Sequence, residues 1–130
     1  MKGCYILLIR IDRSESIRVG RLGDIAFKPG CYAYVGSAMN NMEKRIERHL
    51  RLRKKVFWHI DYLLKKGKII GIFIRESLRK QECDVAAKLS DKLRSVQNFG
   101  CSDCTCKSHL FFHEDEQNIR SYIEIALRNV

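Results

Sequence analysis

The segment that most restricts the fold of this chain is residues 3–11, a nearly continuous apolar run beside the N-terminus. Successive side chains of a strand point to opposite faces of its sheet. One face would carry Tyr5, Leu7, Ile9 and Ile11, and the opposite face would carry Cys4, Ile6 and Leu8. Because both faces are apolar, we expect a central strand that is covered on both sides, and therefore a layered domain.

The remaining apolar patterns predict strands first and mainly helices afterwards. Further strands are expected near 17–19 and 25–27 as a hairpin, at 31–36 and 68–75, and at an edge near 109–113. Helices are expected after a cap at Asn40 or Asn41 through Leu50, within 56–66, from about Lys80 to Val96, and from about Gln117 to Arg128. The second helix would bury Phe57, Ile60 and Leu64. This order predicts an α+β fold with a small mixed or antiparallel sheet flanked by helices.

Length and charge favour one domain that binds an anionic partner. A chain of 130 residues has the size of a single domain, which we assign to residues 1–130. Its formal net charge is +10, and 42–55 alone carries seven Lys or Arg against two Glu. A solvated helix face would need fewer bases, so we favour contact with a phosphate backbone. The candidates are Lys44, Arg48, Arg51, Arg53, Lys54 and Lys55.

The N-terminal apolar run is too short for a signal peptide or a membrane span, since Arg10 and Asp12 interrupt it. We therefore expect a cytoplasmic protein without a membrane partner. In that compartment the six cysteines would be mostly reduced thiols, and some could be metal ligands.

Glu82 is an anomaly in the helix expected from Lys80 to Val96. The apolar stripe of this helix comprises Val85, Ala86, Leu89, Leu93 and Val96, and Glu82 lies on the same stripe. A carboxylate that points at a core needs a cation partner. That partner could be a basic side chain in a structural salt bridge or a bound metal ion, and the sequence leaves both open.

Several short strings resemble the GIY-YIG nuclease superfamily. They are Gly3-Cys4-Tyr5, then Tyr34-Val35-Gly36 with Ser37-Ala38, then Glu43-Lys44-Arg45-Ile46-Glu47-Arg48-His49. The resemblance covers about residues 3–96 and implies a three-stranded sheet with flanking helices. Cys4 stands where Ile is usual, and residues 12–30 would be an inserted hairpin. This arrangement resembles an uncharacterised branch of the superfamily, which is found alone or fused to a DNA glycosylase.

The resemblance also implies a site and an activity. Tyr5 would help to deprotonate water, Tyr34 would orient water or phosphate, and Arg45 would neutralise charge on the phosphate. His49 would contact phosphate or assist proton transfer, and Glu82 would hold one Mg²⁺ or Mn²⁺ ion. His59 lies where some members place another histidine that contacts nucleic acid. The implied function is a divalent-metal-dependent endonuclease acting on DNA in repair or processing, with a DNA-repair enzyme as a further partner.

The segment 99–113 is rich in cysteine and histidine. Cys101, Cys104, Cys106 and His109 offer the thiolate and imidazole ligands that zinc prefers. Their spacing does not match a standard zinc motif, so we favour a packing role and keep zinc as the alternative. Two other functions therefore remain beside the endonuclease: a non-catalytic nucleic-acid-binding module of the same fold, and a zinc-binding protein.

Overall fold

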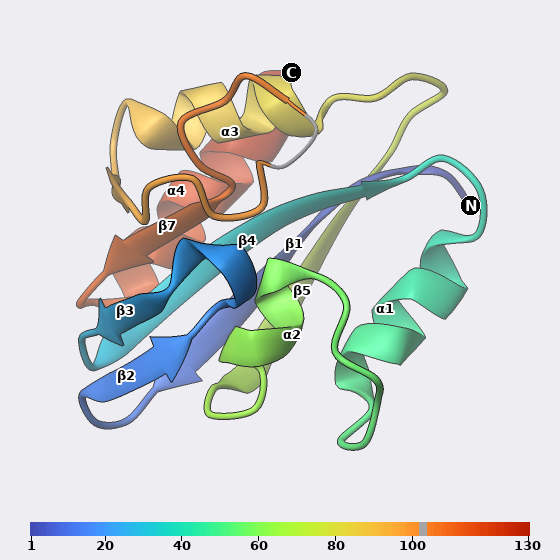
Figure 1. Ribbon diagram of the computed structural model, residues 1–130. Coiled ribbons are helices and arrows are strands. Elements are labelled where there is room, and N and C mark those ends of the chain that lie inside the picture. The colour runs from blue at the N-terminus through green and yellow to red at the C-terminus, as the bar shows by residue number, and fades with distance from the viewer. Residues whose placement is uncertain (102–103) are drawn as a thin grey trace.

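The computed structural model describes residues 1–101 and 104–130. It confirms an α+β fold, built on a five-stranded antiparallel sheet with the strand order β5-β1-β4-β7-β6 (Figure 1). These strands are β1 (Gly3–Ile11), β4 (Gly30–Ala38), β5 (Lys68–Glu76), β6 (Arg94–Ser95) and β7 (Leu110–His113). The three longest strands, β5, β1 and β4, lie side by side, and β7 and β6 extend the sheet beyond β4.

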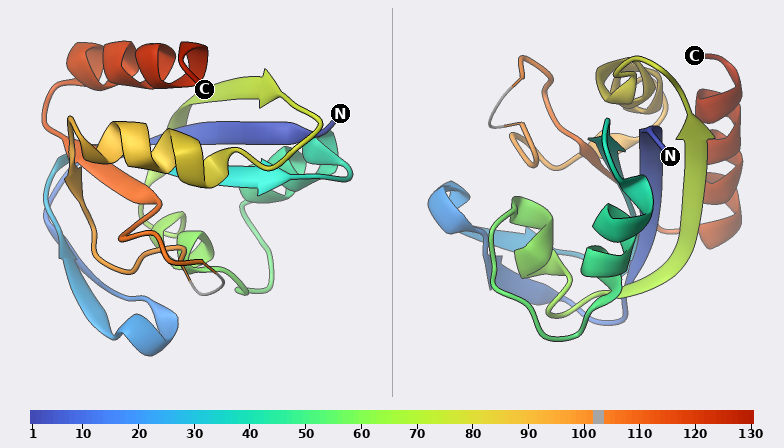
Figure 2. Two further views of the ribbon diagram at one scale, coloured as in Figure 1. Left: turned by 90° about the horizontal axis from the view of Figure 1, so that it is seen from above. Right: turned by 90° about the vertical axis from the view of Figure 1, so that its right-hand side faces the viewer.

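The sheet is covered on both faces (Figure 2). One face packs against α1 (Met42–Leu50), α2 (His59–Leu63) and a separate hairpin of β2 (Glu15–Arg18) and β3 (Asp24–Phe27), which a short 3-10 turn (Gly20–Leu22) connects. The other face packs against α3 (Glu82–Ser90) and α4 (Glu116–Arg128). None of the helices within 1–101 and 104–130 is long and apolar enough to cross a membrane.

The strand β1 has the two buried faces that its sequence predicts. Tyr5, Leu7 and their neighbours on that face pack toward α1, α2 and the hairpin. Cys4, Ile6 and Leu8 pack toward α3 and α4. The cap of α1 is also as expected, since the Asn41 side chain accepts a hydrogen bond from the backbone N–H of Lys44.

Two helix predictions need correction. The helix expected within 56–66 begins only at His59, because the Asp61 carboxylate accepts hydrogen bonds from the backbone N–H groups of Phe57 and Trp58 and holds them outside the helix. Phe57 is consequently 77% exposed and not part of a buried stripe. The helix expected to reach Val96 ends at Ser90.

The chain after α3 joins the sheet instead of remaining helical. Arg94 and Ser95 pair with β7 as the short strand β6, and the backbone N–H of Val96 donates to the carbonyl of Leu110. The strand β7 is therefore not an edge, because β4 lies on its other side. This extension brings the segment that follows α3 next to the end of β4.

Candidate active site and metal centre

Six of the candidate site residues predicted from the sequence line one cavity. Tyr5, Tyr34, Arg45 and Glu82 all line a cavity of about 430 Å³, and His59 and His109 line it as well. The cavity lies where β4 extends past β7, whose ladder ends at Tyr34. Beyond that point the backbone N–H of Val35 donates to the carbonyl of His109. Arg45 from α1, on one face of the sheet, and Glu82 from α3, on the other face, both line the cavity beside this end of β4.

Two glycines allow Tyr5 to reach the cavity. Tyr5 and Gly36 are paired across β1 and β4, and a Cβ atom on Gly36 would lie 2.5 Å from the Tyr5 ring. Gly3 has a φ of +147°, and a Cβ atom there would collide with the carbonyl oxygen of Arg75. A side chain at either position would displace β1 or the tyrosine ring.

Tyr5 and His49 form a buried hydrogen-bonded pair. The Tyr5 hydroxyl lies 2.7 Å from Nε2 of His49. Burial raises the pKa of Tyr5 to about 12 and lowers the pKa of His49 to about 4. Both groups are therefore neutral at pH 7. Nδ1 of His49 has no hydrogen-bond partner among the described residues.

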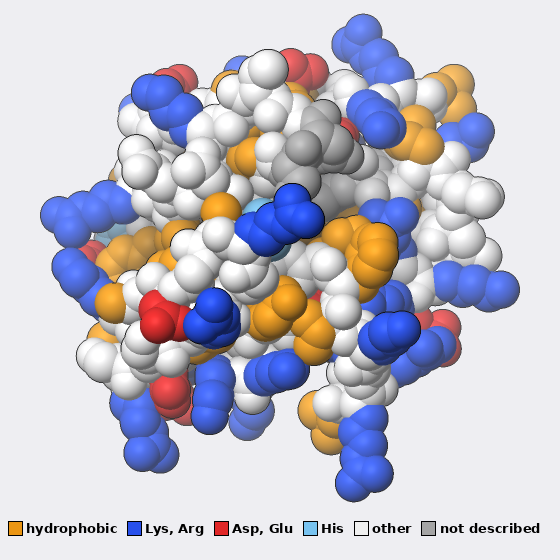
Figure 3. Space-filling view, in the orientation of Figure 1, with side chains coloured by type: hydrophobic (Ala, Val, Ile, Leu, Met, Phe, Trp, Pro, Cys, Tyr) orange, Lys and Arg blue, Asp and Glu red, His pale blue; other side chains and the backbone are white. Residues whose placement is uncertain are grey.

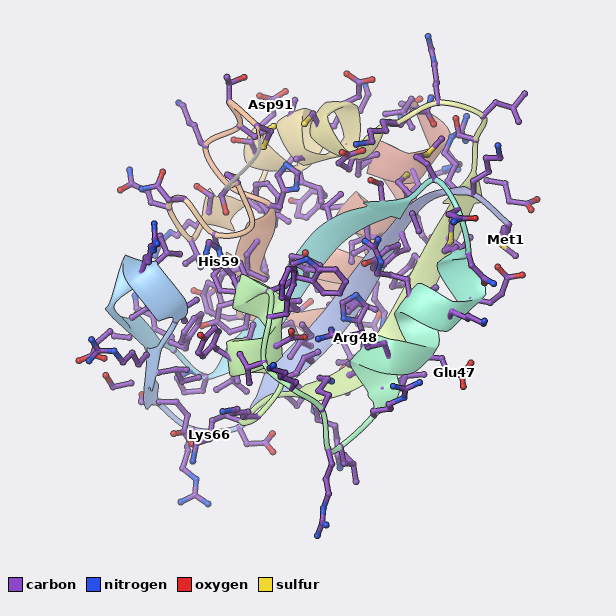
Figure 4. The ribbon with its side chains drawn as sticks, turned by 45° about the vertical axis from the view of Figure 1, so that its right-hand side comes forward. Met1, Glu47, Arg48, His59, Lys66 and Asp91 are labelled. Carbon is purple, nitrogen blue, oxygen red and sulfur yellow. The ribbon has the colours of Figure 1, made fainter. Side chains whose placement is uncertain are left out.

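Arg45 and Arg48 lie on one helix but have different surroundings. Arg45 lines the cavity and donates to the carbonyl of Ser37 over 2.9 Å. Arg48 donates to both oxygens of Asp61, each over 3.0 Å. Both guanidinium groups lie over the Trp58 ring, at 4.7 and 4.5 Å from its centroid. In Figure 4 Arg48 points inward from α1 whereas Glu47 points away. Arg45 is thus the one placed to meet a ligand in the cavity.

The Asp61 carboxylate is 1% exposed and fully engaged. Burial opposes its ionisation, but the hydrogen bonds from Arg48 and from the backbone of Trp58 and Phe57 outweigh that effect and lower the pKa of Asp61. This ion pair fastens α1 to the start of α2, and so fixes Trp58 beside the cavity.

The predicted phosphate-binding bases divide into two groups. Lys54 donates to the carbonyls of Arg48, His49 and Arg51 and so caps the end of α1. Together with the Asp61 pairing of Arg48, this engages two of the predicted bases within the protein. The exposed bases are Lys44, Arg51, Arg53 and Lys55. Figure 3 shows Lys and Arg side chains over α1 and the loop that follows it.

His59 connects α2 to the segment after Phe99. Its Nδ1 accepts a hydrogen bond from the backbone N–H of Gly100 over 2.8 Å, and burial lowers the pKa of His59. The acceptor role requires an unprotonated Nδ1, in agreement with the direction of that shift. His59 thus helps to form the wall of the cavity.

Glu82 lies in the first turn of α3 and is half-buried. Packing of Val85, Ala86 and Leu89 against the sheet sets the orientation of the helix. Oε2 of Glu82 is buried and has no hydrogen-bond partner among the described residues. A carboxylate oxygen in this position fits a hard divalent cation, which prefers oxygen ligands. No salt bridge within 1–101 and 104–130 includes Glu82, so the salt-bridge alternative has no support in the structure.

A second group of potential metal ligands lies beside Glu82. One ligand atom from each of Cys83, Cys104, Cys106 and His109 lies within 4.8 Å of all the others. Nε2 of His109 is 3.8 Å from Sγ of Cys83 and 3.5 Å from Sγ of Cys104. We call these four residues the Cys/His cluster. It could hold a metal ion.

The composition of this cluster corrects the ligand set expected from the sequence. Cys101 is outside it, and the Cys101 thiol donates to the carbonyl of Phe99 over 3.4 Å. Cys83 takes its place, although it lies on α3, far from the cysteine-rich segment in the sequence. No local spacing could have indicated Cys83, because only the packing of α3 beside the loop brings it to the other three.

Two thiols of the cluster, Cys83 and Cys106, favour the protonated form when no cation is bound. Burial, and after it the neighbouring Cys106 and Cys104, raise the pKa of Cys83 to about 12. Burial also raises the pKa of Cys106. No disulfide joins any of the six cysteines, all of which lie within the described residues. Three thiols and an imidazole are ligands for a soft or borderline metal, and they favour zinc over Mg²⁺ or Mn²⁺.

A comparison with protein-family models identifies one match, over residues 4–130, to the family described as Domain of unknown function DUF123. The chain belongs to this family. Searches with the chain among curated proteins and among solved structures found no match. In this DUF123 protein the matched residues include Tyr5, Tyr34, Arg45 and Glu82 of the cavity and all four residues of the Cys/His cluster, of which His109 also lines the cavity.

Proposed function

We propose that this DUF123 protein is a divalent-metal-dependent phosphodiesterase of the GIY-YIG type that cuts nucleic acid, with DNA as the favoured substrate. The observation that supports it is the convergence of Tyr5, Tyr34, Arg45 and Glu82 on one cavity. These residues come from β1, β4, α1 and α3. Unrelated packing requirements would not gather two phenols, a guanidinium and an unpaired carboxylate at one place.

In this proposal Glu82 holds a single Mg²⁺ or Mn²⁺ ion, which supplies Lewis-acid chemistry to the phosphate and the leaving oxygen. Arg45 binds a non-bridging oxygen and offsets the charge that develops there. Tyr34 orients the phosphate or the attacking water. Water forms the new bond to phosphorus, and the bond from phosphorus to the leaving oxygen breaks.

The proton of the attacking water needs an acceptor. A free Tyr5 phenolate is not available at pH 7, because burial raises the pKa of Tyr5 to about 12. Nε2 of neutral His49, 2.7 Å from the Tyr5 hydroxyl, can receive the phenolic proton while Tyr5 takes one from water. This arrangement gives His49 the role of final proton acceptor.

The exposed bases on and after α1 would bind the backbone on either side of the scissile phosphate. Lys44, Arg51, Arg53 and Lys55 provide charge without sequence recognition. Such a surface gives little selectivity, so we propose that a DNA-repair enzyme directs this domain to its substrate.

The test is a cleavage panel of branched, nicked, damaged and single-stranded DNA and RNA with Mg²⁺ and with Mn²⁺. We expect a cut DNA strand with the unchanged protein and a loss of about 10²-fold or more with Glu82→Gln. Asp84→Asn is the matched control, because Asp84 is an exposed acid in the same helical turn and does not line the cavity. If no substrate is cut while salt-sensitive binding persists, the non-catalytic binding module is the correct function.

We also propose that zinc occupies the Cys/His cluster. The supporting observation is the convergence of its three sulfur atoms and one nitrogen within 4.8 Å. In a tetrahedral zinc site with Zn–S bonds of about 2.3 Å, neighbouring sulfur atoms lie roughly 3.8 Å apart. The cluster therefore needs only small shifts to bind the ion.

Elemental analysis of protein purified without added metal tests this proposal. We expect about one equivalent of zinc. The Cys106→Ser variant should lose it, and Cys101→Ser, which changes a cysteine outside the cluster, should retain it. Zinc below about a tenth of an equivalent in the unchanged protein would contradict the proposal.

A further inference from the structure

We propose that zinc bound by Cys83, Cys104, Cys106 and His109 positions Glu82 at the cavity. The zinc centre would thus orient the carboxylate that binds Mg²⁺ or Mn²⁺. The inference rests on the proposed function for the role of Glu82. It assigns to Cys83 a positioning role and not a catalytic one.

No side-chain capping hydrogen bond among the described residues fixes the beginning of α3. Its N-cap residue, Gln81, makes no side-chain capping hydrogen bond. Oε1 of Gln81 and Oε2 of Glu82 are both buried without a hydrogen-bond partner among the described residues. The apolar contacts of α3 with the sheet begin only at Val85, one turn later. Something other than capping must therefore hold the first turn.

Cys83 is the residue that can supply this anchor. It is adjacent to Glu82 in the first turn and belongs to the Cys/His cluster. A helix turn moves as a unit, so a bond from Cys83 to a metal restrains the Glu82 backbone directly. Without a metal, the contacts of Cys83 with the described part of the cluster are weak hydrogen bonds of sulfur, such as its 3.8 Å contact with Nε2 of His109.

The other end of the anchor is fixed to the sheet. The backbone carbonyl of His109 accepts from the N–H of Val35, and the N–H of His109 donates to the carbonyl of Phe99. His109 also lines the cavity, together with Tyr5 and Arg45. A zinc ion between Cys83 and His109 would therefore tie the first turn of α3 to the same end of β4 that carries Tyr34 and Gly36. The distance from Glu82 to the other cavity residues would then be set by metal–ligand bonds.

The orientation of metal ligands by neighbouring groups commonly contributes 10- to 100-fold to metal affinity. We accordingly expect zinc removal to weaken Mn²⁺ binding at Glu82 by about 10-fold or more. Nucleic-acid binding in the absence of divalent ions should change little, because the exposed bases belong to α1 and its following loop, on the other face of the sheet.

The experiment compares the unchanged protein, Cys106→Ser and the matched control Cys101→Ser. Zinc content is measured first, and then Mn²⁺ affinity by electron paramagnetic resonance and hydrogen exchange of peptides covering α3. Glu82→Gln identifies which Mn²⁺ site is observed. We expect only Cys106→Ser to lose zinc, to bind Mn²⁺ more weakly and to exchange faster in the first turn of α3. Where Cys106→Ser does not fold, zinc is removed from the unchanged protein with a chelator and restored afterwards.

Each outcome decides one point. Unchanged Mn²⁺ affinity and unchanged exchange in zinc-free protein would overturn the positioning role. Faster exchange throughout the sheet would overturn it as well, because zinc would then hold the entire fold. If the unchanged protein shows no Mn²⁺ site that depends on Glu82, the proposed nuclease function fails, and exchange in the first turn of α3 alone decides whether zinc positions this turn.

Discussion

Replacement of Tyr5 by Phe removes one oxygen atom from the proposed proton route. The Tyr5 hydroxyl is the hydrogen-bond partner of Nε2 of His49, at 2.7 Å, and Nδ1 of that ring already lacks a partner among the described residues. The variant would leave a buried imidazole, 2% exposed, with neither nitrogen paired. The ring of Phe fits the same space above Gly36, so we expect the packing of β1 and β4 to persist.

The expected loss of stability follows from the unpaired imidazole. A buried polar group that loses its partner costs about 1–3 kcal/mol. For a domain of this size each kcal/mol lowers the midpoint of thermal unfolding by roughly 3–6 °C. We also expect the rate of cutting to fall about 10²- to 10⁴-fold, because proton transfer from water loses its acceptor.

Tyr32→Phe is the matched control. Tyr32 is also buried, lies on the same face of the sheet and makes one hydrogen bond, from its hydroxyl to the carbonyl of Lys28 at 2.7 Å. It does not line the cavity. We expect its loss to cost about 0.5–1.5 kcal/mol and to leave cutting unchanged.

The measurements are thermal unfolding by circular dichroism and single-turnover cutting at a temperature where both variants are folded. If folded Tyr5→Phe cuts at the rate of the unchanged protein, Tyr5 does not carry the proton. If both variants lose stability equally, the pairing with His49 has no special energetic role.

Three further predictions concern the surroundings of the cavity. Burial lowers the pKa of His49 from 6.5 to about 4, so between these pH values the folded state binds fewer protons than the unfolded state. The free energy of unfolding, measured with urea, should therefore fall by about 3 kcal/mol more from pH 7 to pH 4 in the unchanged protein than in His49→Gln. Asp61→Asn leaves Arg48 without its carboxylate partner and should lower the free energy of unfolding by about 3–5 kcal/mol in the same assay. A decrease under about 1 kcal/mol would contradict a stabilising role for this ion pair. Phe57 is exposed at the cavity and offers its ring for stacking of an unpaired base, so Phe57→Ala should weaken binding to single-stranded DNA by about 1–3 kcal/mol. Leu52→Ala is the control, because Leu52 is a fully exposed residue of the same loop, and it should leave this binding unchanged.

Part of the site could be predicted from the sequence because short local motifs contain the residues concerned. Arg45 and His49 lie one helical turn apart in a helix whose cap was also predictable. Glu82 is recognisable in the sequence because its charge interrupts an apolar stripe. Their convergence with Tyr5 and Tyr34 on one cavity was an expectation from resemblance, and the packing of four separate elements brings it about.

The two buried faces of residues 3–11, the strands that flank them and the capped start of α1 follow from the sequence alone, because alternation and capping depend on neighbours in the chain. Three features depend on the folded chain: Phe57 lies outside α2, β6 pairs with β7 so that β7 is not an edge, and Cys83 replaces Cys101 in the Cys/His cluster. In each case the deciding contact forms only in the folded chain. The Asp61 carboxylate accepts hydrogen bonds from the backbone N–H groups of Phe57 and Trp58, β7 pairs with both β4 and β6, and α3 lies beside the loop that carries Cys104 and Cys106. Contacts of this kind leave no periodic signal in the sequence.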